Sequence, residues 1–336
     1  MDVRQVGWST RRRQLDAILV GNGCSGRGQS KPGLTHTMAA PCTHEAVTLR
    51  LLLVRHGLSS FNVERRIQGR DDLSTLTETG VDQARRTGTA LADVPITAVY
   101  SSPLQRAALT TAGVLAARND ALEPCFDDGL LEIDLEPWSG LTAAERAERF
   151  PEEYAAWRSH PEQLELTRHD GTRYRPLPEL MQQASQFLDA LLARHPVDSN
   201  ETVLLVGHNA ILRCLITTLL GNPAGGFRRL RLDNASLSVF NLIPQGSDHQ
   251  VQIECLNSTA HLNPPIPPKG TGSRMILVRH GETNWNRDGR FQGQIDIPLN
   301  SNGHAQAEAA RAFLESVSIQ RAYSSAMSRP RETAEG

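Results

Sequence analysis

The sequence has few cysteines and no long apolar run. Its five cysteines are odd in number and form no C-x-x-C pair, a usage typical of a reducing compartment rather than of a disulfide-linked secreted protein. The longest apolar candidate, residues 210–220, is interrupted by Arg213 and falls short of the roughly 18 residues that a membrane-spanning helix needs. We therefore expect a cytoplasmic protein with no membrane partner.

The sequence also has little net charge. Its 35 basic and 37 acidic residues give a formal net charge of -2 at pH 7, which leaves no reason to expect nucleic acid as a partner. Apolar residues at 39% and charged ones at 21% are typical of a globular protein, and 336 residues suffice for one large domain or two ordinary ones. The sequence does not define an oligomeric state.

Residues 1–47 differ from the rest of the chain. They are rich in Arg, Gly, Ser and Thr and show no sustained periodicity, so we predict a disordered leader or a mis-assigned one, with Met38 as the true start. An organellar transit peptide is the alternative. Gly21–Gly26 reads G-N-G-C-S-G and matches the dinucleotide fingerprint, but Pro32 and Gly33 interrupt the segment where its helix should run. We expect no cofactor there.

One stretch occurs twice in the chain. Residues 51–62 read L-L-L-V-R-H-G-L-S-S-F-N, and residues 275–286 read M-I-L-V-R-H-G-E-T-N-W-N. An apolar run that ends at a glycine predicts a buried strand, which would place Arg55 and His56 at the edge of a sheet. The second copy repeats these residues as Arg279 and His280. Further repeated positions are Asn286, for Asn62, and Arg329, for Arg106.

These repeats predict the domain organisation. We expect a complete domain at 48–256, a proline-rich linker at 257–273 and a truncated second domain at 274–336 that has a first strand, a first helix and a second strand. About 60 residues bury too little surface to be stable alone. We therefore expect the chain to be a fragment of a longer two-domain protein, with a tail that is poorly stable unless it docks on the first domain.

Apolar periodicity predicts alternating strands and helices in the first domain. We expect strands at 51–54, 97–100, 202–206, 236–242 and 251–256, and helices at 76–92, 101–117, 142–158, 177–195 and 210–220. This order predicts an α/β three-layer sandwich with a mostly parallel sheet and helices on both faces. The carboxyl ends of parallel strands should meet at one rim.

Residues suited to phosphoryl transfer follow several of these strands. A neutral histidine such as His56 can attack phosphorus and form a phosphohistidine. Arg55 and Arg106 can bind phosphate through their planar guanidinium groups, and His208 follows a later strand. A leaving oxygen also needs a proton, for which Glu132 is a candidate. This chemistry requires no metal, and we predict none.

The motifs resemble those of the histidine phosphatase superfamily, in its phosphoglycerate mutase-like branch. They are R-H-G at 55–57, S-S-P-L-Q-R at 101–106, the acid loop at 130–140 and G-H-N at 207–209. The resemblance covers 49–256 fully and 274–336 in part. It implies that His56 is the phosphorylated nucleophile, that Glu132 is the proton donor, and that the phosphate is held by Arg55, Arg106 and His208. It also implies substrate contacts from Ser59, Asn62, Gln68, Gly69 and Glu179.

The chain departs from the family pattern at two places. Leu58 stands where Glu or Gln is usual after R-H-G, and Pro137 replaces a frequent glycine in the acid loop. In that loop Asp134 and Glu136 compete with Glu132 for the acid role. Glu179 is equally interpreted as a first-turn helix acid that the helix dipole favours.

The implied activity is hydrolysis of a small sugar or sugar-acid phosphate. Two copies joined by a proline-rich linker resemble the 2-carboxy-D-arabinitol-1-phosphatase-like proteins of plants and cyanobacteria, which makes 2-carboxy-D-arabinitol 1-phosphate the leading candidate substrate. Phosphoglycerate mutase and α-ribazole phosphatase activities are the alternatives within the family. A regulator that binds a phosphorylated ligand without turnover is the alternative from another class.

Overall fold

The computed structural model describes residues 4–5, 48–118, 121–221 and 226–336, which belong to two compact units. One unit is Cys24–Leu262, and the other joins Met1–Gly23 with Asn263–Gly336. The predicted leader lies outside the described residues except for Arg4–Gln5 (β1), and so does the Gly21–Gly26 stretch. No helix among the described residues has the length and apolar character needed to cross a membrane.

The larger unit is built on a six-stranded sheet with the order β4-β3-β7-β2-β8-β9. The strands are β2 (Leu49–Arg55), β3 (Ala98–Ser101), β4 (Cys125–Phe126), β7 (Thr202–Gly207), β8 (Leu237–Gln245) and β9 (Asp248–Ser258). β2, β7, β3 and β4 pair in parallel, whereas β8 pairs antiparallel with both β2 and β9. The predicted mostly parallel sheet is confirmed.

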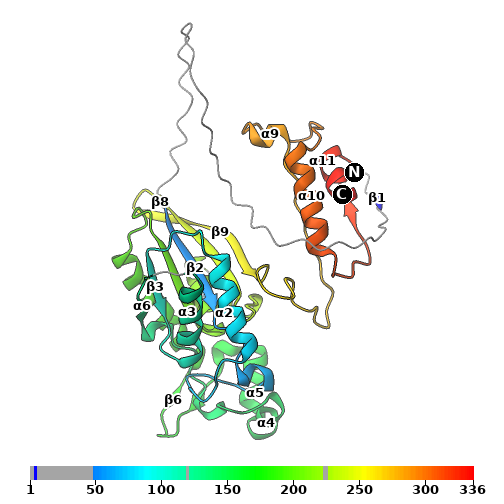
Figure 1. Cartoon of the computed structure of the whole chain (residues 1–336). Helices are drawn as coiled ribbons and strands as arrows, with labels where there is room; N and C mark the ends of the chain where they lie inside the picture. The colour runs from blue at the N-terminus through cyan, green and yellow to red at the C-terminus, as the bar shows by residue number, and fades with distance from the viewer. Residues whose placement is uncertain (1–3, 6–47, 119–120, 222–225) are drawn as a thin grey trace. The chain divides into compact units, whose positions relative to one another are not determined.

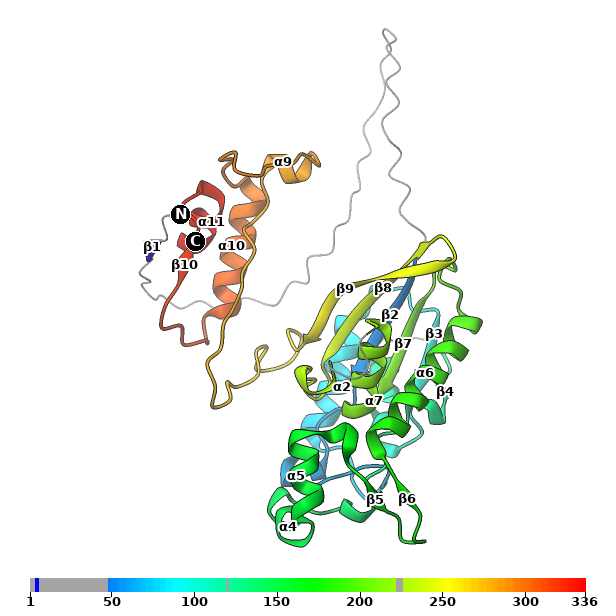
Figure 2. The same cartoon turned by 180° about the vertical axis from the view of Figure 1, so that it is seen from behind.

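Helices cover both faces of this sheet, as predicted. They are α1 (Ser60–Glu64), α2 (Glu78–Ala90), α3 (Gln105–Arg118), α4 (Ala143–Arg149), α5 (Pro151–Ser159), α6 (Pro176–Arg194) and α7 (Asn209–Leu219), with 3-10 turns at Asp128–Leu130, Glu136–Trp138, Pro161–Gln163 and Phe227–Arg229. Figure 1 shows α2 and α3 on one face, and Figure 2 shows α6 and α7 on the other.

The side chains of β2 explain why both faces are covered. Successive residues of a strand point to opposite faces of the sheet. Leu51 and Leu53 belong to the core that contains the apolar side chains of α6 and α7, while Leu52 and Val54 belong to the core on the α3 side. An uninterrupted apolar run is therefore what a central strand of a three-layer sandwich requires.

Smaller elements lie at one end of the sheet, where α4, α5 and the hairpin β5 (Leu166–Thr167) and β6 (Arg173–Tyr174) gather (Figures 1 and 2). Trp138 is fully buried and joins this cap to the core. Its ring lies 6.2 Å from that of Trp157 and 6.4 Å from that of Phe150. Edge-to-face and tilted contacts of this kind fix the position of the cap.

Two glycines let the loop after β2 lie against the start of α2. A Cβ atom at Gly80 would stand 2.2 Å from the carbonyl oxygen of Leu58, and one at Gly57 would stand 2.5 Å from that of Gly80. Thr77 caps α2, the helix predicted at 76–92, by accepting a hydrogen bond from Gly80 N at 3.1 Å, and its hydroxyl donates to Leu58 O at 3.0 Å. The loop that carries His56 is thus anchored on a helix.

The smaller unit contains α9 (Asn284–Arg287), α10 (Ser301–Leu314), β10 (Tyr323–Ser324) and α11 (Ser328–Glu335), with β1 paired antiparallel to β10. The strand predicted at its start does not form. Met275 and Leu277 are 83% and 86% exposed, and no strand in the described part of the chain pairs with them. Their counterparts in β2 lie between β7 and β8, and the repeat lacks those neighbours.

Candidate active site

A cavity of about 170 Å³ opens at the carboxyl ends of the parallel strands. It brings together most of the residues predicted from the sequence, although they are far apart in the chain. The predicted residues that line it are Arg55, His56, Asn62, Gln68, Gly69, Arg106 and Glu132. The remaining polar lining is supplied by Arg66, Asn209 and Arg213, which the sequence interpretation did not include.

His56 is held rigidly at the end of β2. Its backbone N–H donates to Gly207 O at 2.9 Å, and its side chain is only 2% exposed. Ring Nδ1 lies 2.8 Å from Gly57 O, and because a carbonyl only accepts, Nδ1 carries the hydrogen and Nε2 keeps its lone pair. Burial, followed by the charges of Arg55 and Arg106, holds the pKa of His56 well below 6.5. His56 is therefore a neutral imidazole at pH 7.

His208 lies beside His56, with 5.2 Å between the ring centroids. Its Nε2 is 2.8 Å from the hydroxyl oxygen of Ser102, the second serine of the S-S-P-L-Q-R motif. Its Nδ1 is buried without a partner in the described chain. Burial is also the main cause of the low pKa of His208, with smaller contributions from Arg106, His56 and Arg55. The predicted pair of histidines thus meets at one rim.

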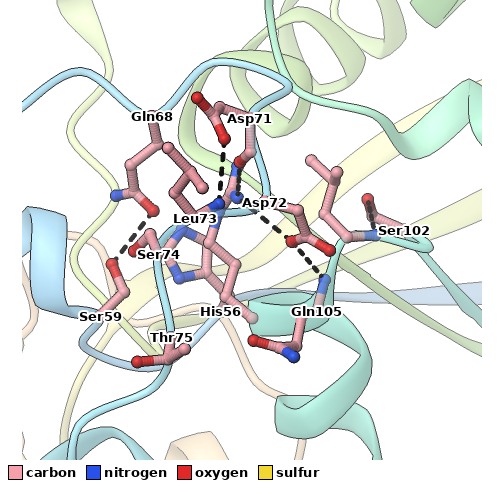
Figure 3. A network of polar contacts seen from close by, with 12 residues as sticks. His56, Ser59, Gln68, Asp71, Asp72, Leu73, Ser74, Thr75, Ser102 and Gln105 are labelled. Carbon is pink, nitrogen blue, oxygen red and sulfur yellow. Dashed lines mark hydrogen bonds and ion pairs between the residues drawn. The ribbon is translucent and has the colours of Figure 1, made fainter. Parts of the chain in front are cut away.

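Two arginines flank His56. The buried guanidinium of Arg106 donates to Gly69 O at 2.7 Å and to Asp71 O at 2.9 Å, which ties it to the loop shown in Figure 3. Arg55 donates to Leu232 O at 2.7 Å. Burial lowers the pKa of Arg55 to about 10, so it remains a cation at neutral pH. The Nε atoms of both arginines are buried and have no partner among the described residues.

Ser59 supports the polar loop rather than lining the cavity. It is fully buried, and its hydroxyl oxygen lies 2.8 Å from Asn62 Oδ1 and 3.1 Å from Gln68 Oε1 (Figure 3 shows the second contact). Asn234 donates to Asn62 Oδ1 at 2.9 Å and to His56 O at 3.1 Å. The amide side chains of the predicted contact residues are therefore positioned by hydrogen bonds.

Glu132 lies against the first turn of α7. Its Oε1 accepts from the backbone N–H groups of Ile133 at 2.9 Å, Ala210 at 3.0 Å and Ile211 at 3.2 Å, whereas Oε2 accepts only from Ala210, at 3.1 Å. The positive end of a helix stabilises a carboxylate in this position. Oε2 has fewer donors around it than Oε1.

The two competing acids of the same loop lie outside the cavity. Asp134 pairs with Arg168 at 3.0 Å, and Glu136 accepts from the backbone N–H of His169 at 2.9 Å. Glu179 also pairs with Arg168, at 2.9 Å, and is not part of the cavity lining. The structure therefore does not bring Glu179 to the other predicted residues.

Two arginines of the cavity, Arg213 and Arg66, were not predicted from the sequence, and the sequence indicates only the first of them. Arg213 is the one charged residue in an otherwise apolar helical run, a pattern that a buried functional charge produces. Arg66 carries no such signal, because it follows other charged residues in a polar loop. No group of three or more His, Cys, Asp or Glu in the described chain is arranged to hold a metal ion.

The second copy reproduces the local contacts of the first. His280 Nδ1 lies 2.7 Å from Gly281 O, as His56 does with Gly57. Arg329 donates to Gly293 O and Ile295 O at 2.8 and 2.9 Å, in the manner of Arg106. Thr283 contacts Asn286 and Gln292. Residues 274–336 contain no second acid loop and no second G-H-N motif.

The two buried histidines predict a dependence of stability on pH. Their pKa values are lowered in the folded protein, so between the folded values and 6.5 the unfolded chain binds more protons. We expect the free energy of unfolding to fall as the pH drops below 6.5, by up to about 1.4 kcal/mol per pH unit for each histidine. Urea denaturation at pH 7.5 and 5.5 measures this loss. His208→Gln should reduce the slope, and an equal slope in that variant would contradict the assignment.

The sheet order, the helices on both faces and the buried histidines at the strand rim define an α/β protein of the phosphoglycerate mutase-like kind. A sequence model of the histidine phosphatase superfamily (branch 1) matches residues 51–256 and 275–336. The chain belongs to this superfamily.

Relatives and solved structures agree with this membership. The chain is 35% identical over 275 residues to a probable 2-carboxy-D-arabinitol-1-phosphatase of Arabidopsis thaliana, covering 78% of this chain and 54% of the relative. It is 33% identical over 214 residues to phosphoserine phosphatase 1 of Hydrogenobacter thermophilus, covering 64% of this chain and 94% of the relative. The structure of mycobacterial glucosyl-3-phosphoglycerate phosphatase with VO3 matches with a TM-score of 0.52 and 26% identity, covering 62% and 98% of the two chains. The chain spans about half the length of the plant relative.

Proposed function

We propose that the chain hydrolyses phosphomonoesters through a phosphohistidine at His56. The observation that supports this most directly is a buried, neutral histidine whose Nε2 is free, between two cationic arginines and in the same cavity as Glu132. A neutral imidazole nitrogen has the lone pair that attack on phosphorus needs. The flanking guanidinium groups supply the positive charge that the transferred group's oxygens need.

The reaction then proceeds in two steps. In the first, His56 Nε2 forms a bond to phosphorus, the ester P–O bond breaks, and Glu132 gives a proton to the leaving oxygen. In the second, water attacks the phosphohistidine, the N–P bond breaks, and Glu132 takes the proton of that water. Arg55, Arg106 and His208 hold the phosphoryl group throughout. The proton returns to Glu132, so the site is ready for another cycle.

The proposed substrate is a small sugar or sugar-acid phosphate, with 2-carboxy-D-arabinitol 1-phosphate as the first candidate. The names of two plant relatives support this choice: the 2-carboxy-D-arabinitol-1-phosphatases of Arabidopsis thaliana (probable) and Triticum aestivum are 35% and 32% identical to the chain. We propose that residues 48–256 form the complete catalytic domain, with His56 as its nucleophile, because the acid loop and the G-H-N motif both lie within this range.

A panel of phosphomonoesters assayed on the full chain without added metal tests the proposal. We expect release of inorganic phosphate, with 2-carboxy-D-arabinitol 1-phosphate among the best substrates. Conversion of 3-phosphoglycerate to 2-phosphoglycerate only when 2,3-bisphosphoglycerate is present would instead show a mutase. Binding of phosphorylated ligands without any turnover would overturn the enzyme proposal in favour of a regulator.

A further inference from the structure

Arg213 forms a distinct part of the cavity wall together with two aromatic side chains. Its guanidinium carbon lies 5.4 Å from the ring centroid of Phe227, whose ring lies 6.3 Å from that of Trp157. All three residues line the cavity. An arginine on an aromatic surface keeps its guanidinium plane fixed, which prepares it for a planar anionic partner.

The four arginines of the cavity differ in what they already bind. Arg66 pairs with Glu64 at 2.8 Å and Glu145 at 3.5 Å. Arg55 and Arg106 donate to backbone carbonyls. Arg213 donates to no acceptor in the described part of the chain, and its Nε is buried without a partner.

A partly buried guanidinium whose N–H groups have no acceptor destabilises the fold unless a bound ligand supplies the acceptors. A buried donor without an acceptor loses its hydrogen bonds to water and gains nothing in return. The Nε atoms of Arg55 and Arg106 are also buried without a partner among the described residues, but their Nη groups donate to backbone carbonyls, and Arg66 has carboxylate partners. Arg213 is therefore the arginine whose hydrogen-bonding capacity is left for a bound molecule.

Arg213 lies on the Glu132 side of the cavity: burial lowers its pKa, the charge of Glu132 is the largest opposing influence, and its own charge also acts on Arg55. The charges of Arg55 and Arg106 lower the pKa of both His56 and His208, and Arg213 is not among the groups that do so. It lies on α7 one turn beyond Asn209, on the far side of the residues whose N–H groups hold Glu132. Because Glu132 is the proposed proton donor to the leaving oxygen, the charge of Glu132 on Arg213 points to a place for Arg213 beside the part of the substrate that leaves.

We propose that Arg213 binds a carboxylate of the substrate and selects phosphorylated acids over neutral phosphomonoesters. The inference rests on the proposed function, because it assigns a recognition role within the same cavity. A carboxylate matches the fork of a guanidinium with two parallel hydrogen bonds. Trp157 and Phe227 give this end of the cavity an apolar wall, and an ion pair formed against it is less screened than one in water.

The test uses two substrates that differ only in the carboxylate proposed to bind Arg213. 3-Phosphoglycerate carries a carboxylate where glycerol 3-phosphate carries a hydroxymethyl group. We expect the full wild-type chain to prefer the acid. In Arg213→Met, kcat/KM for 3-phosphoglycerate should fall roughly 100-fold, as for a truncated buried charge pair, while that for glycerol 3-phosphate stays nearly constant. Arg213→Lys should recover part of the preference, since it keeps the charge and loses the fork.

Arg66→Met is the matched control. It removes another cavity arginine, one that already has carboxylate partners, so the ratio of the two kcat/KM values should not change. An equal fall for both substrates in Arg213→Met, with an unchanged melting temperature, would overturn the proposal, as would a wild-type chain with no preference for the acid.

A second readout separates this inference from the proposed function. If the wild type turned over neither of these two compounds nor any other phosphomonoester of the panel, the hydrolase proposal would fail, and the same comparison would be made by calorimetric binding. Tighter binding of 3-phosphoglycerate that is lost in Arg213→Met would still support the carboxylate site. Equal binding of both compounds by the wild type would reject it.

Discussion

Replacing His56 with alanine should lower kcat for phosphomonoester hydrolysis by at least about 10⁴-fold, as loss of a covalent nucleophile does in other enzymes. The alanine variant lacks the nitrogen that forms the phosphoryl-enzyme bond, while the arginines and Glu132 stay in place. Stopped assays of phosphate release with the best substrate of the panel measure the effect. Rapid quench with ³²P-labelled substrate should trap an acid-labile label in the wild type and none in the variant.

The chain provides its own matched control for this substitution. His280→Ala changes the same residue type in the same R-H-G context, with the same backbone contact from Nδ1. Because residues 274–336 contain no acid loop and no G-H-N motif, we expect His280→Ala to leave kcat of the 336-residue chain unchanged. A large loss of activity in His280→Ala, or turnover that survives in His56→Ala, would contradict the assignment of the nucleophile.

Replacing Glu132 with glutamine should lower kcat for alkyl phosphates by about 10²- to 10⁴-fold, the usual contribution of a positioned acid. Glutamine keeps an oxygen that can accept from Ala210 and Ile211 but cannot supply a proton. In kcat/KM, which reports the first step, the loss should nearly vanish with p-nitrophenyl phosphate, because p-nitrophenolate leaves without protonation. The dependence on the leaving group distinguishes a lost acid from a damaged site.

Glu136→Gln is the control for this prediction. Glu136 belongs to the same loop but contacts the backbone of His169 outside the cavity, so its removal should have no such dependence on the leaving group. If Glu136→Gln lost activity on alkyl phosphates and Glu132→Gln did not, Glu136 would be the proton donor instead of Glu132. Equal losses with both types of substrate in Glu132→Gln would indicate that the carboxylate acts through positioning instead.

Local patterns in the sequence predicted much of the fold. The apolar run before Arg55 specified β2, and the run 202–206 specified β7 to within one residue, because both are central strands buried on two faces. Thr77 specified the start of α2 through its cap. The same reasoning failed at Met275, since an apolar run forms a strand only where neighbouring strands supply hydrogen-bond partners.

The meeting of His56, His208 and Arg106 at one end of the sheet was predictable, because each of them follows a strand of the parallel sheet. The site was not predictable where a contact depends on how distant segments pack. Trp157, in α5 of the cap, and Phe227, in the 3-10 turn Phe227–Arg229, meet at the cavity only through the packing of distant segments, and nothing in their local sequence indicates this. Glu179 shows the converse, because its place in the motif order does not reveal that Arg168 binds its carboxylate away from the cavity.

The contact between Glu132 and the start of α7 has a consequence for how this protein tolerates change. Catalytic groups commonly cost a protein stability, so that removing them makes the fold more robust at the expense of activity. Here the proposed acid also satisfies buried backbone N–H groups of a core helix. Selection for higher folding stability would therefore retain Glu132, and inactive variants with another residue at position 132 should be less stable than the wild type.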